Sequence, residues 1–201
     1  MTTTFARALG RIALVAGTVL AFGLPAASLA QDNEFAAPLT ELANGKLREI
    51  AQNEVIVAAV TAQNGNSAAY DQAEIDRLDS QWRAEVGGAS KPLIDATLAT
   101  DASKWLAAVQ EESAGLFTEV FVMDAKGLNV AQSTVTSDYW QGDEDKFSLS
   151  FGAGADAVHL GEIEQDESTQ TFQSQVSITV TDPATGAPIG AITAGVDLSK
   201  L

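Results

Sequence analysis

The stretch QVSITVTDPATGAPIGAITAGVD, residues 175–197, carries the clearest fold signal in the chain. Apolar residues alternate with polar ones in two runs on either side of a turn at 182–186: Val176, Ile178 and Val180, then Ile192, Ala194 and Val196. Alternation with a period of two places the apolar side chains on one face of a strand. Asp, Pro and Gly between two such runs mark a turn. The stretch therefore predicts a β-hairpin with one apolar face.

Other β-prone runs lie upstream of this hairpin. Residues 119–123 and 128–131 flank the short loop Asp124-Ala-Lys-Gly127, which predicts a second hairpin. Residues 158–164 and 171–175 are further extended segments with mixed polar and apolar side chains. We expect an antiparallel sheet of about five strands.

The first half of the chain has helical periodicity instead. Apolar residues recur at helical spacing at Leu39, Leu42, Ala43, Leu47 and Ile50. We expect this long N-terminal helix to continue through 55–60, with a kink or an early break at Asn44-Gly45 and a turn at 63–67. Further helix starts are predicted at Asp71, Pro92 and Thr100. Helices followed by an antiparallel sheet make the fold class α+β.

The first thirty residues have the pattern of a secretory signal peptide. Arg7 and Arg11 precede an apolar run at 12–24, and the small residues around Ala30 suit a cleavage site. The run is shorter than the roughly 20 residues that a membrane-spanning helix needs. We therefore expect residues 1–30 to be removed, 31–38 to be a short polar segment, 39–201 to be one domain, and the protein to be periplasmic.

Composition excludes several classes of function. The chain has 27 acidic and 11 basic residues, and two of the basic ones lie in the expected signal peptide. Nine basic against 27 acidic residues leave a net charge of −18, which repels nucleic acid, so no nucleic-acid partner is expected. The chain has no Cys, which excludes disulfides and thiol catalysis.

Three segments together resemble one family. They are FVMDAKGLNVAQS at 121–133, SDYWQGDEDK at 137–146 and PIGAITAGVD at 188–197. They are similar to segments of the Cache superfamily of extracytoplasmic, PAS-like sensor domains, of the single-Cache or PDC type. The resemblance implies a long N-terminal helix along a central antiparallel sheet and a small-molecule pocket between that sheet and the loops that cross one face.

Members of that family are usually the outer part of a membrane receptor. Because this chain ends at Leu201, we expect it to act through a separate membrane receptor or kinase. The resemblance also implies that two copies can pair through the N-terminal helix. That helix's apolar face can equally be used up by the sheet, and the sequence leaves both open.

The insertion between the predicted strands supplies the candidate ligand-binding residues, which are Asp138, Tyr139, Trp140, Asp143 and Glu144. Flat aromatic rings give contact area at little entropic cost, and carboxylates accept hydrogen bonds from an amine. With no arginine in the segment, this set favours a small polar, amine-bearing ligand. The alternative that Tyr139 and Trp140 pack the insertion onto the sheet stays open.

Metal and catalytic chemistry have little support in the sequence. The acidic run at 143–145 lacks the Asp-x-Asp-x-Asp-Gly spacing of a calcium loop, so no metal is expected. His159 is the only histidine, and no Gly-x-Ser-x-Gly element is present to place a nucleophile. No cofactor motif occurs, because Gly152-Ala-Gly154 lacks the third glycine of a dinucleotide-binding loop. We expect a sensing or binding module and no enzyme. The alternative is a structural or interaction module that keeps the fold without a ligand pocket.

Overall fold

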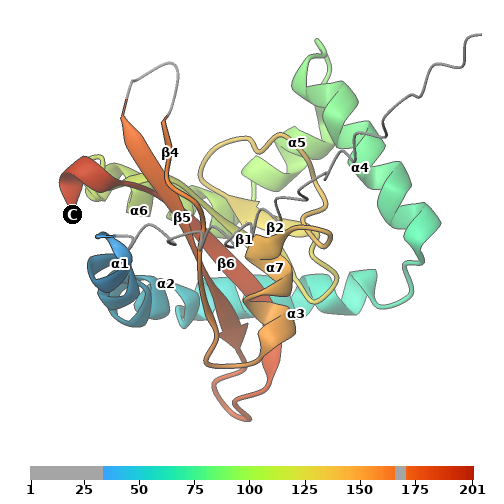
Figure 1. Ribbon diagram of the computed structural model, residues 1–201. Coiled ribbons are helices and arrows are strands. Elements are labelled where there is room, and N and C mark those ends of the chain that lie inside the picture. Colours follow the sequence, from blue (N-terminus) through green and yellow to red (C-terminus); the bar gives the residue numbers. More distant parts are fainter. Residues whose placement is uncertain (1–33, 166–170) are drawn as a thin grey trace, which may run out of the picture. The chain divides into compact units, whose positions relative to one another are not determined.

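A computed structural model describes residues 34–165 and 171–201. The expected signal peptide at 1–30 lies outside the described residues. The helices are α1 (Ala36–Leu42), α2 (Arg48–Ala51), α3 (Glu54–Ser67), α4 (Gln72–Val86), α5 (Pro92–Leu98), α6 (Asp101–Glu112) and α7 (Asp145–Ser148). The strands are β1 (Phe117–Asp124), β2 (Asn129–Gln132), β3 (Val158–Leu160), β4 (Glu164–Gln165), β5 (Phe172–Thr181) and β6 (Pro188–Asp197). Figure 1 shows helices first and then most of the sheet along the chain.

The strands form one open antiparallel sheet in the order β2-β1-β6-β5-β3, and β4 also pairs with β5. The α+β prediction is confirmed, with one short strand more than the expected five. In the hairpin of β5 and β6, Val176 lies opposite Ala194 and Ile178 lies opposite Ile192. All four side chains are fully buried in the same core cluster. The two apolar runs therefore share one face, as their alternation predicts.

The N-terminal helical region differs from the single long helix that we expected. Asn44-Gly45 lies in a π-helical turn, η1 (Ala43–Leu47), which continues α1 into α2 without a break. The break comes instead at Gln52–Asn53, where the Asn53 side chain accepts a hydrogen bond from the Val55 amide at 2.9 Å and starts α3. The turn predicted at 63–67 is also wrong, because α3 runs through Ser67.

The other helix starts are confirmed, and two of them have capping side chains. The Asp71 carboxylate accepts a hydrogen bond from the Glu74 amide at 3.0 Å and starts α4. Pro92 is the first residue of α5. The Thr100 hydroxyl accepts a hydrogen bond from the Ser103 amide at 3.1 Å and starts α6. Each cap satisfies a backbone N–H that has no partner within the helix.

The two faces of the sheet have different partners. One face carries the main core, in which buried residues of α1, η1, α2, α3 and α6 pack on β1, β5 and β6. The apolar face of the N-terminal region is thus packed against the sheet, and pairing of two copies through it stays a prediction. On the other face, Phe121, Met123 and Ala191 pack against Phe147 of α7. Figure 1 shows α7 lying over this second face.

A third cluster joins α4 and α5 to the β1–β2 hairpin. It contains Ile75, Trp82, Ile94, Leu128 and Tyr139, all of them buried.

None of the helices in the described part of the chain is long and apolar enough to span a membrane.

Candidate functional site

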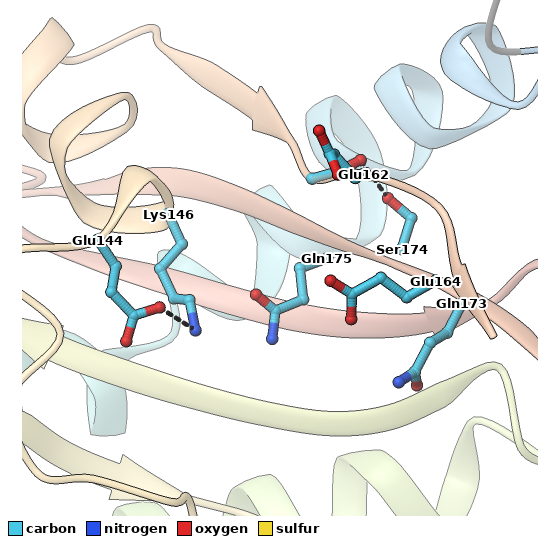
Figure 2. Close-up of a pocket in the computed structure, with 8 residues that line it drawn as sticks. Glu144, Lys146, Glu162, Glu164, Gln173, Ser174 and Gln175 are labelled. Carbon is cyan, nitrogen blue, oxygen red and sulfur yellow. Dashed lines mark hydrogen bonds and ion pairs between the residues drawn. The ribbon is translucent and has the colours of Figure 1, made fainter. Parts of the chain in front are cut away.

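A cavity of about 230 Å³ lies on the second face of the sheet, between β5 and the segments that cross it. Its lining comes from β5, from the β3–β4 segment and from α7 with its cap: Glu144, Lys146, Gly161, Glu162, Glu164, Gln173, Ser174 and Gln175. Figure 2 shows Glu144 and Lys146 at one end, Glu164 and Gln173 at the other, and Gln175 between them.

The charges in this larger cavity are mostly negative. Three of its side chains are carboxylates and one is an ammonium. Lys146 Nζ lies 2.9 Å from Glu144 Oε2, so these two charges compensate each other. Glu162 and Glu164 are exposed and form no ion pair among the described residues. The end of the cavity near β4 therefore presents uncompensated negative charge.

A smaller cavity of about 90 Å³ adjoins the larger one. It is lined by Glu119, Phe121, Thr136, Ser137, Asp138, Gln141, Lys146 and Gln175. Lys146 and Gln175 line both cavities and form the wall between them.

The position of Gln175 follows from strand geometry. Gln173 and Gln175 alternate with the buried Ser174 and Val176, so their side chains leave the core and point to the second face. Gly195 of β6 lies opposite both Gln175 and Glu119, and a Cβ on Gly195 would clash with Thr118 and Glu119. The Gln175 amide therefore reaches across β6 and donates a 2.9 Å hydrogen bond to Glu119 Oε1.

Asp138, the first of the predicted site residues, lines the smaller cavity and is buried. Its carboxylate accepts hydrogen bonds from Gln141 Nε2, from Ser137 Oγ at 3.1 Å and from Arg83 Nη2 at 3.1 Å. Arg83, 55 residues upstream, thus supplies the cation that the sequence segment lacks. The carboxylate is well satisfied within the protein.

Tyr139 and Trp140 are held by packing and hydrogen bonds. The Tyr139 ring is 6% exposed and stacks on Trp82, with 5.2 Å between ring centroids. Both backbone amides donate to Asp79 Oδ1, at 2.9 and 3.1 Å. Trp140 Nε1 donates to the Lys126 carbonyl at 2.8 Å. Neither ring lines either cavity, so both fix the insertion in place.

Burial also changes the ionisation of Tyr139. Loss of solvent around the phenol, with a smaller contribution from the charge of Asp124, raises its pKa to about 12. The ring therefore stays neutral over the physiological range, as expected for a group in a packed cluster.

The last two predicted site residues, Asp143 and Glu144, differ in whether they line a cavity. Asp143 is exposed and lines neither cavity, whereas Glu144 lines the larger cavity. The prediction that all five residues bind a ligand stays a prediction, and the structure places only Asp138 and Glu144 at cavities.

In the comparisons with known proteins, this chain is similar to solved structures only. No protein-family model matches the chain, and no curated protein matches it. The similar solved structures include the sensor domain of the V. cholerae histidine kinase DctB, with 16% identity and a TM-score of 0.38 over 83% of this chain and 58% of that one. Another is the ligand-binding domain of the Pseudomonas aeruginosa amino acid chemoreceptor PctC in complex with GABA. There the identity is 15% and the TM-score 0.40, over 80% of this chain and 62% of that one.

A third is the ligand-binding domain of the Pseudomonas fluorescens chemoreceptor CtaA in complex with L-alanine, with 12% identity and a TM-score of 0.36 over 81% of this chain and 61% of that one. These neighbours are sensor or ligand-binding domains of a histidine kinase and of chemoreceptors. The chain spans about three fifths of their length.

Sequence reasoning missed most of the larger cavity. Lys146, Glu162, Glu164, Gln173 and Gln175 were not among the candidate residues. The segment 171–175 was predicted to be extended, but Phe172 is its only apolar residue, so no alternation in it marks the face on which the two glutamines lie. The carboxylates at 162 and 164 reach the cavity only because β4 pairs with β5.

A metal centre is not formed in the part of the chain that the structure describes. Within 34–165 and 171–201, no three His, Cys, Asp or Glu side chains come together as a metal site requires.

Proposed function

We propose that this protein is a periplasmic module that captures a small polar, amine-bearing molecule and passes the signal to a separate membrane receptor or kinase. The observation that carries the proposal is the larger cavity, which combines the carboxylate of Glu164 at one end with the amide side chains of Gln173 and Gln175 and is also lined by Glu162. It lies between the sheet and the segments that cross its second face. That is where the Cache resemblance implies a ligand pocket.

The lining of the cavity favours a cation. An ammonium donates charge-assisted hydrogen bonds to carboxylates, and these are roughly twice as strong as neutral ones. Glu162 and Glu164 are the carboxylates without an ion-pair partner among the described residues, so they are the proposed contacts for the amine. The amides of Gln173 and Gln175 can donate to and accept from the polar groups on the rest of the ligand.

The size of the cavity limits the ligand. Pockets for drug-sized molecules run from about 300 to 1,000 Å³, and this one measures about 230 Å³. The proposed ligand is therefore a small metabolite with few non-hydrogen atoms.

Binding without catalysis fits the placement of the reactive groups. His159, the only histidine of the chain, lies on β3 and lines neither cavity. In many acyl-transfer enzymes a histidine beside the nucleophile acts as the general base. The cavity residues offer recognition by charge and hydrogen bonding instead.

A second candidate function is an interaction module, and one observation favours it. Ile163, which directly precedes β4, is 41% exposed, and Phe172, which pairs with Gln165 of β4, is 54% exposed. Exposed apolar side chains in one region can mark a contact surface for a partner protein.

A thermal-shift screen tests the leading function. Small amines, carboxylates and sugars are added separately to the purified protein at equal ionic strength. A ligand at a hundredfold excess over its Kd stabilises the native state by about 2.7 kcal/mol, which raises the Tm of a domain of this size by about 5–10 °C.

We expect an amine to give the largest shift, and Glu164→Gln to reduce it strongly. Glu112→Gln, an exposed residue at the end of α6, is the control and should keep the full shift. Absence of any amine response, or an equal response in both variants, contradicts the proposed function.

A further inference from the structure

Lys146 lies in an environment made for an ammonium group. Its Nζ is 2.9 Å from Glu144 Oε2 and donates a 3.3 Å hydrogen bond to Gln141 Oε1. It also lies 5.5 Å from the centroid of the Phe121 ring, over the ring. A carboxylate, an amide oxygen and an aromatic face all bind ammonium groups in proteins.

This ammonium is largely withdrawn from solvent. The Lys146 side chain is 17% exposed, whereas that of its partner Glu144 is 37% exposed. Figure 2 shows the pair at the end of the larger cavity, with the Lys146 stem extending from α7 into it. A ligand in the cavity therefore has access to the Glu144 carboxylate from the open side.

A movement of the Lys146 side chain would change both cavities, because Lys146 lines both. Its side chain is part of the wall between the two cavities, with Gln175 as the other shared residue. Lysine has a flexible four-carbon stem, so its ammonium can leave one contact and reach another at small cost. Turning Lys146 away would free a complete ammonium site and remove one side of the wall.

We infer that Glu144, Gln141 and the Phe121 ring form an ammonium-binding site that Lys146 occupies in the unliganded protein, so that a ligand's ammonium binds at this site only by replacing that of Lys146. Lys146 is then a specificity-determining residue, because weak amines fail to displace it. The inference rests on the proposed function for its ligand class. It adds a second ammonium position to the one proposed at Glu162 and Glu164.

Competition by a tethered ammonium has a measurable consequence. The apparent affinity of a ligand falls by the fraction of molecules in which its site is free. If Lys146 fills the site in about nine molecules of ten, its removal tightens amine binding about tenfold.

The test is titration of the full protein with n-butylammonium chloride, followed by calorimetry, with sodium chloride and sodium butyrate as ionic controls. Lys146→Met keeps the length of the stem and removes the charge. Lys104→Met, on the exposed face of α6, makes the same change in net charge far from the site and is the matched control. We expect the Lys146→Met variant to bind about tenfold more tightly than wild type, and the control to bind like wild type.

A further variant locates the gain in affinity. Adding Glu144→Gln to Lys146→Met should abolish the gain, because it removes the carboxylate of the vacated site. Circular dichroism checks the fold of each variant, and Lys146→Gln replaces Lys146→Met if the latter does not fold.

The outcomes separate this inference from the proposed function. Wild-type binding with no tightening in Lys146→Met overturns the inference and leaves the proposed function standing. Binding in Lys146→Met with none in wild type supports the ammonium site and overturns the proposed function of the natural protein. Absence of binding in both overturns both.

Discussion

Replacement of Tyr139 by alanine should destabilise the protein strongly, because the ring is part of a packed cluster. Tyr139 is 6% exposed and stacks on Trp82 at 5.2 Å within the cluster that joins α4 and α5 to the β1–β2 hairpin. Removal of a large aromatic side chain from a core costs about 3–5 kcal/mol. For a domain of this size that cost lowers the Tm by about 6–20 °C.

Scanning calorimetry of Tyr139→Ala measures the effect without any ligand. Tyr139→Phe is the control, since it keeps the ring and removes only the hydroxyl, and it should lose far less stability. A Tm for Tyr139→Ala within about 2 °C of wild type would refute the packing role.

The other predictions concern local features of the fold. Asn53→Ala removes the cap of α3 and should cost about 1 kcal/mol in urea unfolding, whereas an unchanged midpoint contradicts the capping role. Gly190→Ala should destabilise by about 1–3 kcal/mol, because the new Cβ would clash with the Met123 carbonyl oxygen. Gly65→Ala, in the open part of α3, should stabilise by about 0.5–1 kcal/mol, and equal effects of the two glycine changes would be inconsistent with the structure. The pKa of Tyr139 in the folded protein is raised to about 12, above its ordinary value of 10. The free energy of unfolding should therefore fall as the pH rises from about 10 to about 12. Tyr139→Phe should lose that part of the pH dependence in the same unfolding assay.

The sheet could be predicted from the sequence because its signals are local and agree with each other. The alternation at 176–180 and 192–196 fixed both the strand type and the buried face, and a polar turn separates the runs. The helix starts at Asp71 and Thr100 were equally local, since each capping side chain lies three residues before the amide from which it accepts a hydrogen bond.

The break in the N-terminal helical region was harder to locate. Asn44-Gly45 has a weaker helix propensity than Gln52-Asn53, where the break lies. Even so, the π-helical turn η1 continues the helix past Asn44-Gly45. Asn53 ends the run because its side chain caps α3 and because both helical parts gain burial against the sheet. Tertiary packing thus decided a choice that propensity alone left open.

The candidate site could be predicted only where residues are close in sequence. The run at 138–144 does border both cavities through Asp138 and Glu144. The acidic end of the larger cavity comes from Glu162 and from Glu164 of β4, and the register that sets Glu164 opposite Gln173 is not given by composition. Arg83 lies outside the segment in sequence, but α4 brings it to 3.1 Å from Asp138.

A crystal structure of the protein with its best-binding amine tests the central claim most directly. We predict that the ammonium lies within hydrogen-bond distance of Glu164 or Glu144, with the rest of the ligand along Gln175 in the larger cavity. A ligand bound on any other surface, with the larger cavity unchanged, would contradict the account.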